Sequence, residues 1–129
     1  MSPGAPCPCG GAAAYADCCG LYHAGPLHLL APDAERLMRS RYAAYVLDDL
    51  DYLRATWHPH TRPAELTPNP AGLKWLGLEV RRAAQQDDTH ATVEFIARSK
   101  LGGRARRLHE TSRFVREGGR WFYVDGDLR

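Results

Sequence analysis

The sequence lacks the hydrophobic segments that would place a chain in or across a membrane. None of its 129 residues belongs to a run approaching about 18 consecutive apolar residues, the length needed for a transmembrane helix. Its first residues contain neither the basic stretch nor the apolar stretch that forms a secretory signal. We therefore expect a soluble, cytoplasmic protein without membrane association.

The sequence also lacks a strong charge of either sign. Its formal net charge is +2, from 17 basic and 15 acidic residues, which gives little support for nucleic-acid binding through bulk charge. Apolar residues make up 44% and charged residues 25% of the chain. These fractions are close to the average for globular proteins, so the composition excludes extensive disorder and fibrous architectures.

Cysteine is absent from residues 20–129, and all four cysteines lie near the N-terminus in the pattern C-x-C-x8-C-C. A disulfide framework usually spreads its cysteines through a secreted chain. A bridge between the adjacent Cys18 and Cys19 would close a strained, very small ring. A reactive thiolate usually has a cationic neighbour, but residues 1–30 contain no Lys or Arg. These absences disfavour oxidised and catalytic cysteines.

The same cysteines suit a structural metal ion. Four thiolates from two short loops can close a tetrahedron around Zn²⁺ with no open coordination position. Gly10 and Gly11 allow a tight turn after Cys9, so that backbone N–H groups can donate to sulfur. We therefore predict one structural Zn²⁺ ion, with redox or disulfide cysteines and unliganded thiols as alternatives. His23 or His28 could replace one cysteine as ligand, but with four cysteines available neither is required. The predicted ligands are Cys7, Cys9, Cys18 and Cys19.

The cysteine cluster and several later segments resemble a known bacterial family. Cys7-Pro8-Cys9-Gly10, Tyr15 and Cys18-Cys19-Gly20 are similar to the SEC-C motif, a small zinc-binding segment first described in the SecA translocation ATPase. Segments spread over the rest of the chain resemble the YchJ-like bacterial proteins: Ala31-Pro32-Asp33, Leu37-Met38-Arg39-Ser40-Arg41-Tyr42, Thr56-Trp57-His58-Pro59, Trp75-Leu76-Gly77-Leu78, Glu110-Thr111-Ser112-Arg113-Phe114 and Trp121-Phe122-Tyr123-Val124-Asp125-Gly126. The resemblance implies a SEC-C motif over residues 1–30 and a nuclear-transport-factor-like α+β domain over residues 31–129. It leaves the biochemical role open.

The chain departs from the SEC-C pattern in its charge. The usual motif continues as Gly-Ser-Gly followed by lysines, whereas this chain has Gly11-Ala12-Ala13-Ala14. In the translocation ATPase the motif binds a chaperone and the ribosome. Residues 1–32 of this chain contain one acidic and no basic residue, and such a surface is poorly suited to RNA. The zinc ligands are therefore transferred from the family, but the ribosome contact is not.

Residues 33–59 predict two helices. Asp33 is a good N-cap, and apolar residues at helical spacing predict a helix over 34–47, with Ser40 mostly on its polar face. A second helix is expected over 50–56 and ends before Pro59. This second helix should bury Leu50, Leu53 and Trp57.

The rest of the chain predicts a loop and then a sheet. Residues 58–70 hold four of the nine prolines, which indicates a long loop with one helical turn near 64–66, as a connector or a lid. Alternating residues separated by turns then predict four antiparallel strands, in the last of which Trp121, Tyr123 and Asp125 share a face. The fold class is therefore α+β: a zinc knuckle followed by a curved antiparallel sheet with helices on its concave face, cystatin-like or nuclear-transport-factor-like.

Glu110 is the only candidate catalytic residue, and the signal for it is weak. It shares a predicted sheet face with Leu108 and Phe114, so it would be a buried carboxylate that needs a partner. The candidates for that partner are Arg41, Arg98 and Arg113. A structural ion pair is the simplest interpretation. The alternative is a general base inside the curved sheet, as in steroid-isomerase relatives of this superfold.

Three other groups carry less information. His109 should point to the face opposite Glu110, so the two cannot act together. His58 and His60 have no third metal ligand nearby, and we do not expect them to bind metal. The run Arg104–Arg107 beside a turn is expected to be a solvated strand edge, with an anionic partner as the alternative.

Three functions follow from these patterns. The cysteine cluster and the missing catalytic constellation favour a zinc-stabilised protein-binding or adaptor module with an unidentified partner, rather than an enzyme. The alternative is a small-molecule enzyme or binder that uses the cone-shaped cavity of the domain, with Glu110 as base or anchor. A ribosome- or nucleic-acid-associated factor is the third, supported only by Arg104–Arg107.

Overall fold

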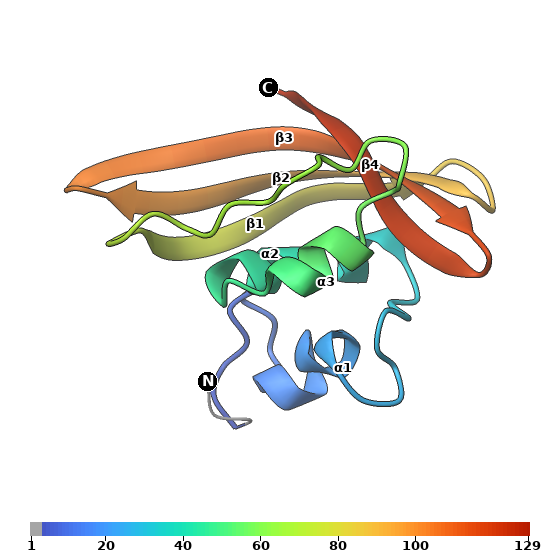
Figure 1. The fold of residues 1–129 in the computed structure, drawn as a ribbon, viewed down its shortest axis with the longest axis horizontal. Helices are drawn as coiled ribbons and strands as arrows, with labels where there is room; N and C mark the ends of the chain where they lie inside the picture. Colours follow the sequence, from blue (N-terminus) through green and yellow to red (C-terminus); the bar gives the residue numbers. More distant parts are fainter. Residues whose placement is uncertain (1–3) are drawn as a thin grey trace.

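A four-stranded antiparallel sheet in the order β1-β2-β3-β4 forms one layer of the structure (Figure 1). The structure is a computed structural model and describes residues 4–129. The strands are β1 (Lys74–Gln85), β2 (His90–Leu101), β3 (Arg104–Glu117) and β4 (Arg120–Leu128). The helices precede the sheet in the chain, which confirms the predicted α+β class.

Helix α2 (Ala34–Val46) packs against β1, β2 and β4 of the sheet, and helix α3 (Leu50–Ala55) packs against α2. Both begin at an aspartate whose carboxylate accepts a hydrogen bond from the backbone, as N-caps do. Asp33 accepts from the amide of Arg36 at 2.7 Å, and Asp49 accepts from the amide of Tyr52 at 3.1 Å. The prediction of two helices and of the Asp33 cap is confirmed.

The cysteine-containing segment forms a third layer, on the side of α2 and α3 that faces away from the sheet (Figure 1). It contains the 3-10 turn η1 (Tyr15–Asp17) and the short helix α1 (Gly20–His23). We call residues 4–30 the knuckle. Because the knuckle covers α2 from outside, Ser40 has 0% exposure. The prediction that Ser40 lies on a polar face was therefore wrong, since α2 is packed on two sides.

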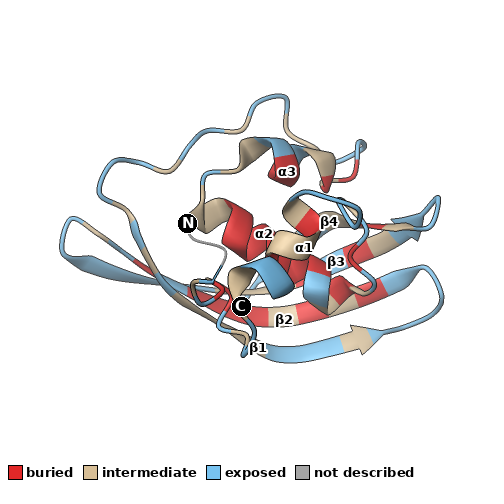
Figure 2. Cartoon of the chain, turned by 90° about the horizontal axis from the view of Figure 1, so that it is seen from below, coloured by how far each residue is buried: buried red, intermediate tan, exposed pale blue. Residues whose placement is uncertain are grey.

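The sheet curves around the helices, which occupy its concave face (Figure 2). Irregular pairing in β1 and β4 contributes to this shape, because a bulge bends a strand and increases its twist. In β4, Tyr123 pairs with Phe114 while Asp125 pairs with Arg113, so that one residue is extra. This bulge reverses the alternation. Asp125 lies on the outer face and bonds Arg113 at 2.6 Å, which corrects the prediction that it shares a face with Tyr123.

The segment after α3 pairs with the free edge of β4. Trp57 forms a parallel bridge with Tyr123, supported by bonds from the His58 amide to the Tyr123 carbonyl and from the Tyr123 amide to the Thr56 carbonyl, both 2.8 Å. Trp57 is therefore half-buried at a sheet edge, and Leu50 is also half-buried. The fully buried residues of α3 are Tyr52 and Leu53, each 1% exposed.

The predicted helical turn near residues 64–66 is absent from the described chain. A turn forms instead at the start of the loop, where the amides of Thr61 and Arg62 donate to the carbonyl of His58. Proline has no amide to donate, and Pro63 follows directly. Within residues 4–129, no helix is long and apolar enough to cross a membrane.

Candidate metal centre and ligand pocket

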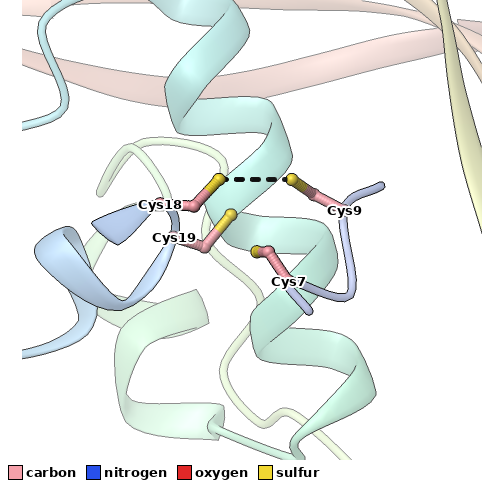
Figure 3. A group of neighbouring side chains, drawn as sticks. All are labelled: Cys7, Cys9, Cys18 and Cys19. Atoms are coloured by element: carbon pink, nitrogen blue, oxygen red, sulfur yellow. Dashed lines mark hydrogen bonds between the residues drawn. The ribbon is translucent and has the colours of Figure 1, made fainter. Parts of the chain in front are cut away.

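The four cysteine sulfurs converge on one point (Figure 3). All four ligand atoms lie within 4.8 Å of one another, and the Cys9 and Cys18 sulfurs are 3.6 Å apart. Zn–S bonds of about 2.3 Å in a tetrahedron place sulfurs roughly 3.8 Å apart. The four cysteines are free, and 3.6 Å is far longer than a disulfide bond of about 2.05 Å. The arrangement fits a single tetrahedral metal ion.

The environment of the sulfurs requires a positive counter-charge. Hydrogen bonds from Cys19 and Cys7 lower the pKa of Cys9, whereas the hydrogen bonds of Cys19 with Cys7 and Cys9 raise the pKa of Cys19. Burial and contacts with its neighbours raise the pKa of Cys18 to about 11. One thiolate can therefore form at neutral pH, but a second and third need a bound cation, because like charges at this distance repel.

The backbone around the sulfurs leaves little space for side chains. A Cβ atom on Gly11 would lie 3.2 Å from the Cys18 sulfur and 3.4 Å from the Cys9 sulfur. The amide of Gly11 donates a hydrogen bond to Cys9, which contributes to lowering the pKa of that thiol. A Cβ on Gly20 would lie only 2.7 Å from the carbonyl oxygen of Tyr15. Glycine is required at both positions because the backbone of Gly11 lies against the cysteine sulfurs and that of Gly20 lies against Tyr15.

A chain of hydrogen bonds fastens the knuckle to α2. The Nε2 atom of His23 donates to the carbonyl of Ser40 at 2.8 Å, so its Nδ1 atom accepts from the Tyr15 hydroxyl at 2.6 Å. The Tyr52 hydroxyl donates to the Ser40 hydroxyl at 2.7 Å, which in turn donates to the Leu37 carbonyl. Sequence reasoning missed this network because its members are spread over η1, α1, α2 and α3.

Neither histidine of the knuckle belongs to the group of possible ligands, which within residues 4–129 consists of the four cysteines. His23 is engaged in the network above, and His28 is exposed. Arg39 provides a further link, since its Nη1 atom donates to the Cys9 carbonyl at 3.2 Å and its Nε atom to Glu35 at 3.0 Å. Arg39 of α2 thus places a cation against the thiolate cluster.

Replacing His23 by phenylalanine should destabilise the protein by about 1–3 kcal/mol, because the buried Ser40 carbonyl and Tyr15 hydroxyl lose their partner while the ring packing on Tyr52 is kept. Burial lowers the pKa of His23. As the pH falls below the unfolded value of about 6.5, the unfolded chain takes up a proton that folded His23 resists, so stability declines. The variant should lose this contribution to the decrease of the unfolding free energy with falling pH, as measured by urea unfolding from pH 8 to 5. An unchanged slope would contradict the assignment.

A second site lies between the sheet and α2. This cavity, which we call the sheet pocket, has a volume of about 370 Å³. Tyr42 and Tyr45 of α2 line it from one side, and Trp75, Phe95 and Tyr123 line it from the strands. Residues 67–70 of the proline-rich loop complete the wall. Asn69 fixes this part of the loop, because its Nδ2 atom donates to the Tyr45 carbonyl at 2.6 Å.

Glu110 lines the sheet pocket on β3 and is half-buried. Its Oε2 atom accepts hydrogen bonds from the hydroxyls of Ser112 and of Tyr123, the latter at 3.4 Å. The bulge in β4 places Gly126 beneath it, where a Cβ atom would lie 2.3 Å from Oε2. The predicted inward face is confirmed.

The predicted ionic partners of Glu110 were wrong. Arg98 pairs with Glu79 at 3.2 Å, and Arg113 pairs with Asp125 and Asp127 on the outer face. Arg41 lines the same pocket, but its nearest bonds go to neutral groups. The strand register explains the difference for Arg98 and Arg113, because both alternate to the side of the sheet away from the helices.

The remaining candidates lie where their spacing predicted. His109 bonds Glu94 at 2.7 Å on the outer face, away from Glu110. His58 bonds Glu117, and His60 packs beside it. β4 pairs with β3 only from Glu110 to Glu117. The exposed run Arg104–Arg107 therefore lies on an uncovered edge, as expected.

The fold and the cysteine cluster together define the class of protein. A curved antiparallel sheet with helices on its concave face, preceded by four cysteines able to hold a metal ion, is an NTF2-like domain joined to a SEC-C-type motif. Residues 33–126 match the family described as "YchJ, middle NTF2-like domain". The chain therefore belongs to the YchJ-like family.

Relatives and solved structures agree with this assignment. A UPF0225 protein of Bordetella parapertussis is 68% identical over 128 residues, covering 99% of this chain and 96% of the relative. The solution structure of a SEC-C motif containing protein from Rhodopseudomonas palustris has a TM-score of 0.80 at 36% identity, covering 95% of this chain and 98% of that one. A crystal structure of a SEC-C motif containing protein from Psychrobacter arcticus has a TM-score of 0.75 at 29% identity, covering 95% and 82%.

Proposed function

We propose that this protein binds a small organic molecule in the sheet pocket, and that the cysteine cluster holds a structural Zn²⁺ ion. The observation that carries the first part is a cavity of about 370 Å³ with aromatic walls and an inward carboxylate on Glu110. Apolar cavities of roughly 300–1,000 Å³ with a few convergent polar groups are typical of small-molecule sites. Glu110 then serves as a hydrogen-bond acceptor for the bound molecule.

The burial of the cysteines supports a structural role for the metal. Cys7, Cys9 and Cys19 are each at most 4% exposed and belong to the same hydrophobic cluster as α2 and the sheet. Four thiolates leave no coordination position for a substrate. The knuckle is bound to its own domain through His23 and Arg39. This arrangement favours stabilisation of the fold over presentation of the knuckle to a partner protein.

Filling the sheet pocket should weaken the binding of small aromatic compounds. Leu108 lines the pocket and is 41% exposed, so Leu108→Trp adds volume there without disturbing the buried core. Single-ring aromatic compounds that bind the wild-type protein in ligand-observed NMR should bind this variant at least about tenfold more weakly. Leu76→Trp is the matched control, because Leu76 is 57% exposed and does not line the pocket. Equal effects of both substitutions, or no binding by any compound, would reject the proposal.

A further inference from the structure

Arg41 is a buried cation without an ion pair. Its side chain extends from α2 beneath the sheet, and the residue is 4% exposed. Nη1 donates to the Leu53 carbonyl at 2.9 Å and to the Thr56 hydroxyl at 2.7 Å. The arginine salt bridges in the described part of the chain involve other arginines. Burying a charge without a counter-charge is costly, so its presence calls for an explanation.

Two donors of the Arg41 guanidinium are left without a protein partner in the described residues. Its Nε and Nη2 atoms make no hydrogen bond in residues 4–129. They differ from Trp57 Nε1, which is fully sealed from solvent and has no partner, because neither Arg41 atom is fully sealed. Arg41 is also one of the residues that line the pocket. The Nε and Nη2 hydrogens point in parallel and form the fork that binds a carboxylate through two hydrogen bonds.

The surrounding rings hold this fork in place. The guanidinium carbon lies 5.0 Å from the centre of the Trp57 ring and 4.5 Å from that of Tyr123. Together with the two bonds through Nη1, these cation–π contacts fix the orientation of the group. A donor pair that is already oriented loses little conformational freedom on binding a ligand.

Tyr123 also connects Arg41 to Glu110. Its ring packs against the guanidinium, while its hydroxyl donates to the Glu110 carboxylate at 3.4 Å. The pocket therefore has a positive and a negative pole separated by one aromatic side chain. A ligand that contacts both poles needs an anionic group at one end, a hydrogen-bond donor at the other and a flat apolar body between them.

We propose that the sheet pocket binds a small aromatic carboxylic acid, whose carboxylate is held by the Nε and Nη2 atoms of Arg41 and whose hydroxyl or amino group donates to Glu110. This inference rests on the proposed function of the pocket and names the class of its ligand. A single guanidinium matches a monocarboxylate in charge. A phosphate group would carry a larger negative charge toward Glu110 and is disfavoured.

The test compares three probes by NMR titration of the full-length, metal-containing protein: 4-hydroxybenzoate, 4-hydroxybenzamide and benzoate. The benzamide lacks the negative charge, and benzoate lacks the donor. We expect 4-hydroxybenzoate to bind at least about tenfold more tightly than the benzamide, since a guanidinium forms stronger hydrogen bonds to a charged carboxylate than to a neutral amide. Benzoate should bind more weakly than 4-hydroxybenzoate by a smaller factor.

Two variants test whether Arg41 is the source of the preference for acid over amide. Arg41→Met should remove the preference for acid over amide, whereas Arg36→Met, on the exposed side of the same helix, should keep it. Should Arg41→Met fail to fold by circular dichroism, the acid-to-amide ratio of the wild-type protein decides alone. Equal affinities for acid and amide would overturn the role of Arg41 and leave the pocket as a neutral binding site. No binding by any of the three, together with failure of the wider aromatic set, would reject the proposed function itself.

Discussion

Removal of the metal ion should unfold the knuckle and strongly destabilise the domain that it covers. Binding of structural Zn²⁺ by thiolates contributes on the order of 10 kcal/mol. Apart from the cysteines, Tyr22 is the only buried side chain of the knuckle, whereas Leu27 and Leu30 are exposed, so apolar packing cannot replace this contribution. Without a cation, the crowded thiols at Cys9, Cys18 and Cys19 cannot ionise together. The buried polar cluster would then separate and expose α2.

Metal analysis and thermal unfolding measure this effect. Anaerobically purified protein should contain about one zinc atom per chain, and the double variant Cys18→Ala, Cys19→Ala should contain none and melt at a much lower temperature. Ala12→Ser is the matched control, because Ala12 is exposed in the same loop and should keep both metal and stability. A wild-type protein free of zinc would exclude zinc as the metal. An unchanged melting temperature of the double variant would exclude a structural role.

Substitution of Tyr52 by alanine should cost about 3–5 kcal/mol, among the largest effects of any single side chain here. Tyr52 is 1% exposed and joins the two helices to the knuckle. It belongs to α3, its hydroxyl bonds Ser40 of α2, and its ring packs edge-on against His23 of the knuckle with centroids 4.6 Å apart. Alanine would leave a cavity where these elements meet.

The conservative variant separates packing from hydrogen bonding. Tyr52→Phe keeps the ring and loses only the bond to the Ser40 hydroxyl, so it should cost about 1 kcal/mol. Chemical denaturation of both variants provides the comparison. If Tyr52→Ala and Tyr52→Phe had equal effects, the ring would not hold the layers together, and the role given to Tyr52 would be wrong.

The outline of the fold and the metal ligands could be predicted because their signals are local. An aspartate before a helical repeat and alternation of period two arise from contacts between residues close in the chain. The same holds for Cys7, Cys9, Cys18 and Cys19, which lie within 13 consecutive residues and need little tertiary structure to converge. The family resemblance rests on these same motifs.

The predictions that were wrong concern side chains whose surroundings come from segments distant in the chain. Ser40 was placed on a solvated face because helical periodicity does not reveal a second layer over α2. Asp125 was placed inside because alternation cannot anticipate the bulge in β4. Glu110 was given an arginine partner, whereas hydroxyl groups from Ser112 and Tyr123 satisfy it. In each case the environment of the side chain depends on pairing across the sheet or across layers.

Patterns of residues close in the chain were sufficient to predict the knuckle and the order of helices and strands, and the composition shows that the chain has no strong net charge. The crowding of cysteines in a short segment remains its most informative feature, because four thiolates in close sequence can form a metal site locally. Tertiary packing was needed to show that Arg41, one residue in a predicted helix, is buried without an ion pair and lines the same cavity as Glu110. Burial and charge compensation depend on what packs against a side chain. For α2 those partners are a sheet that begins 28 residues after the helix ends and a knuckle that precedes it.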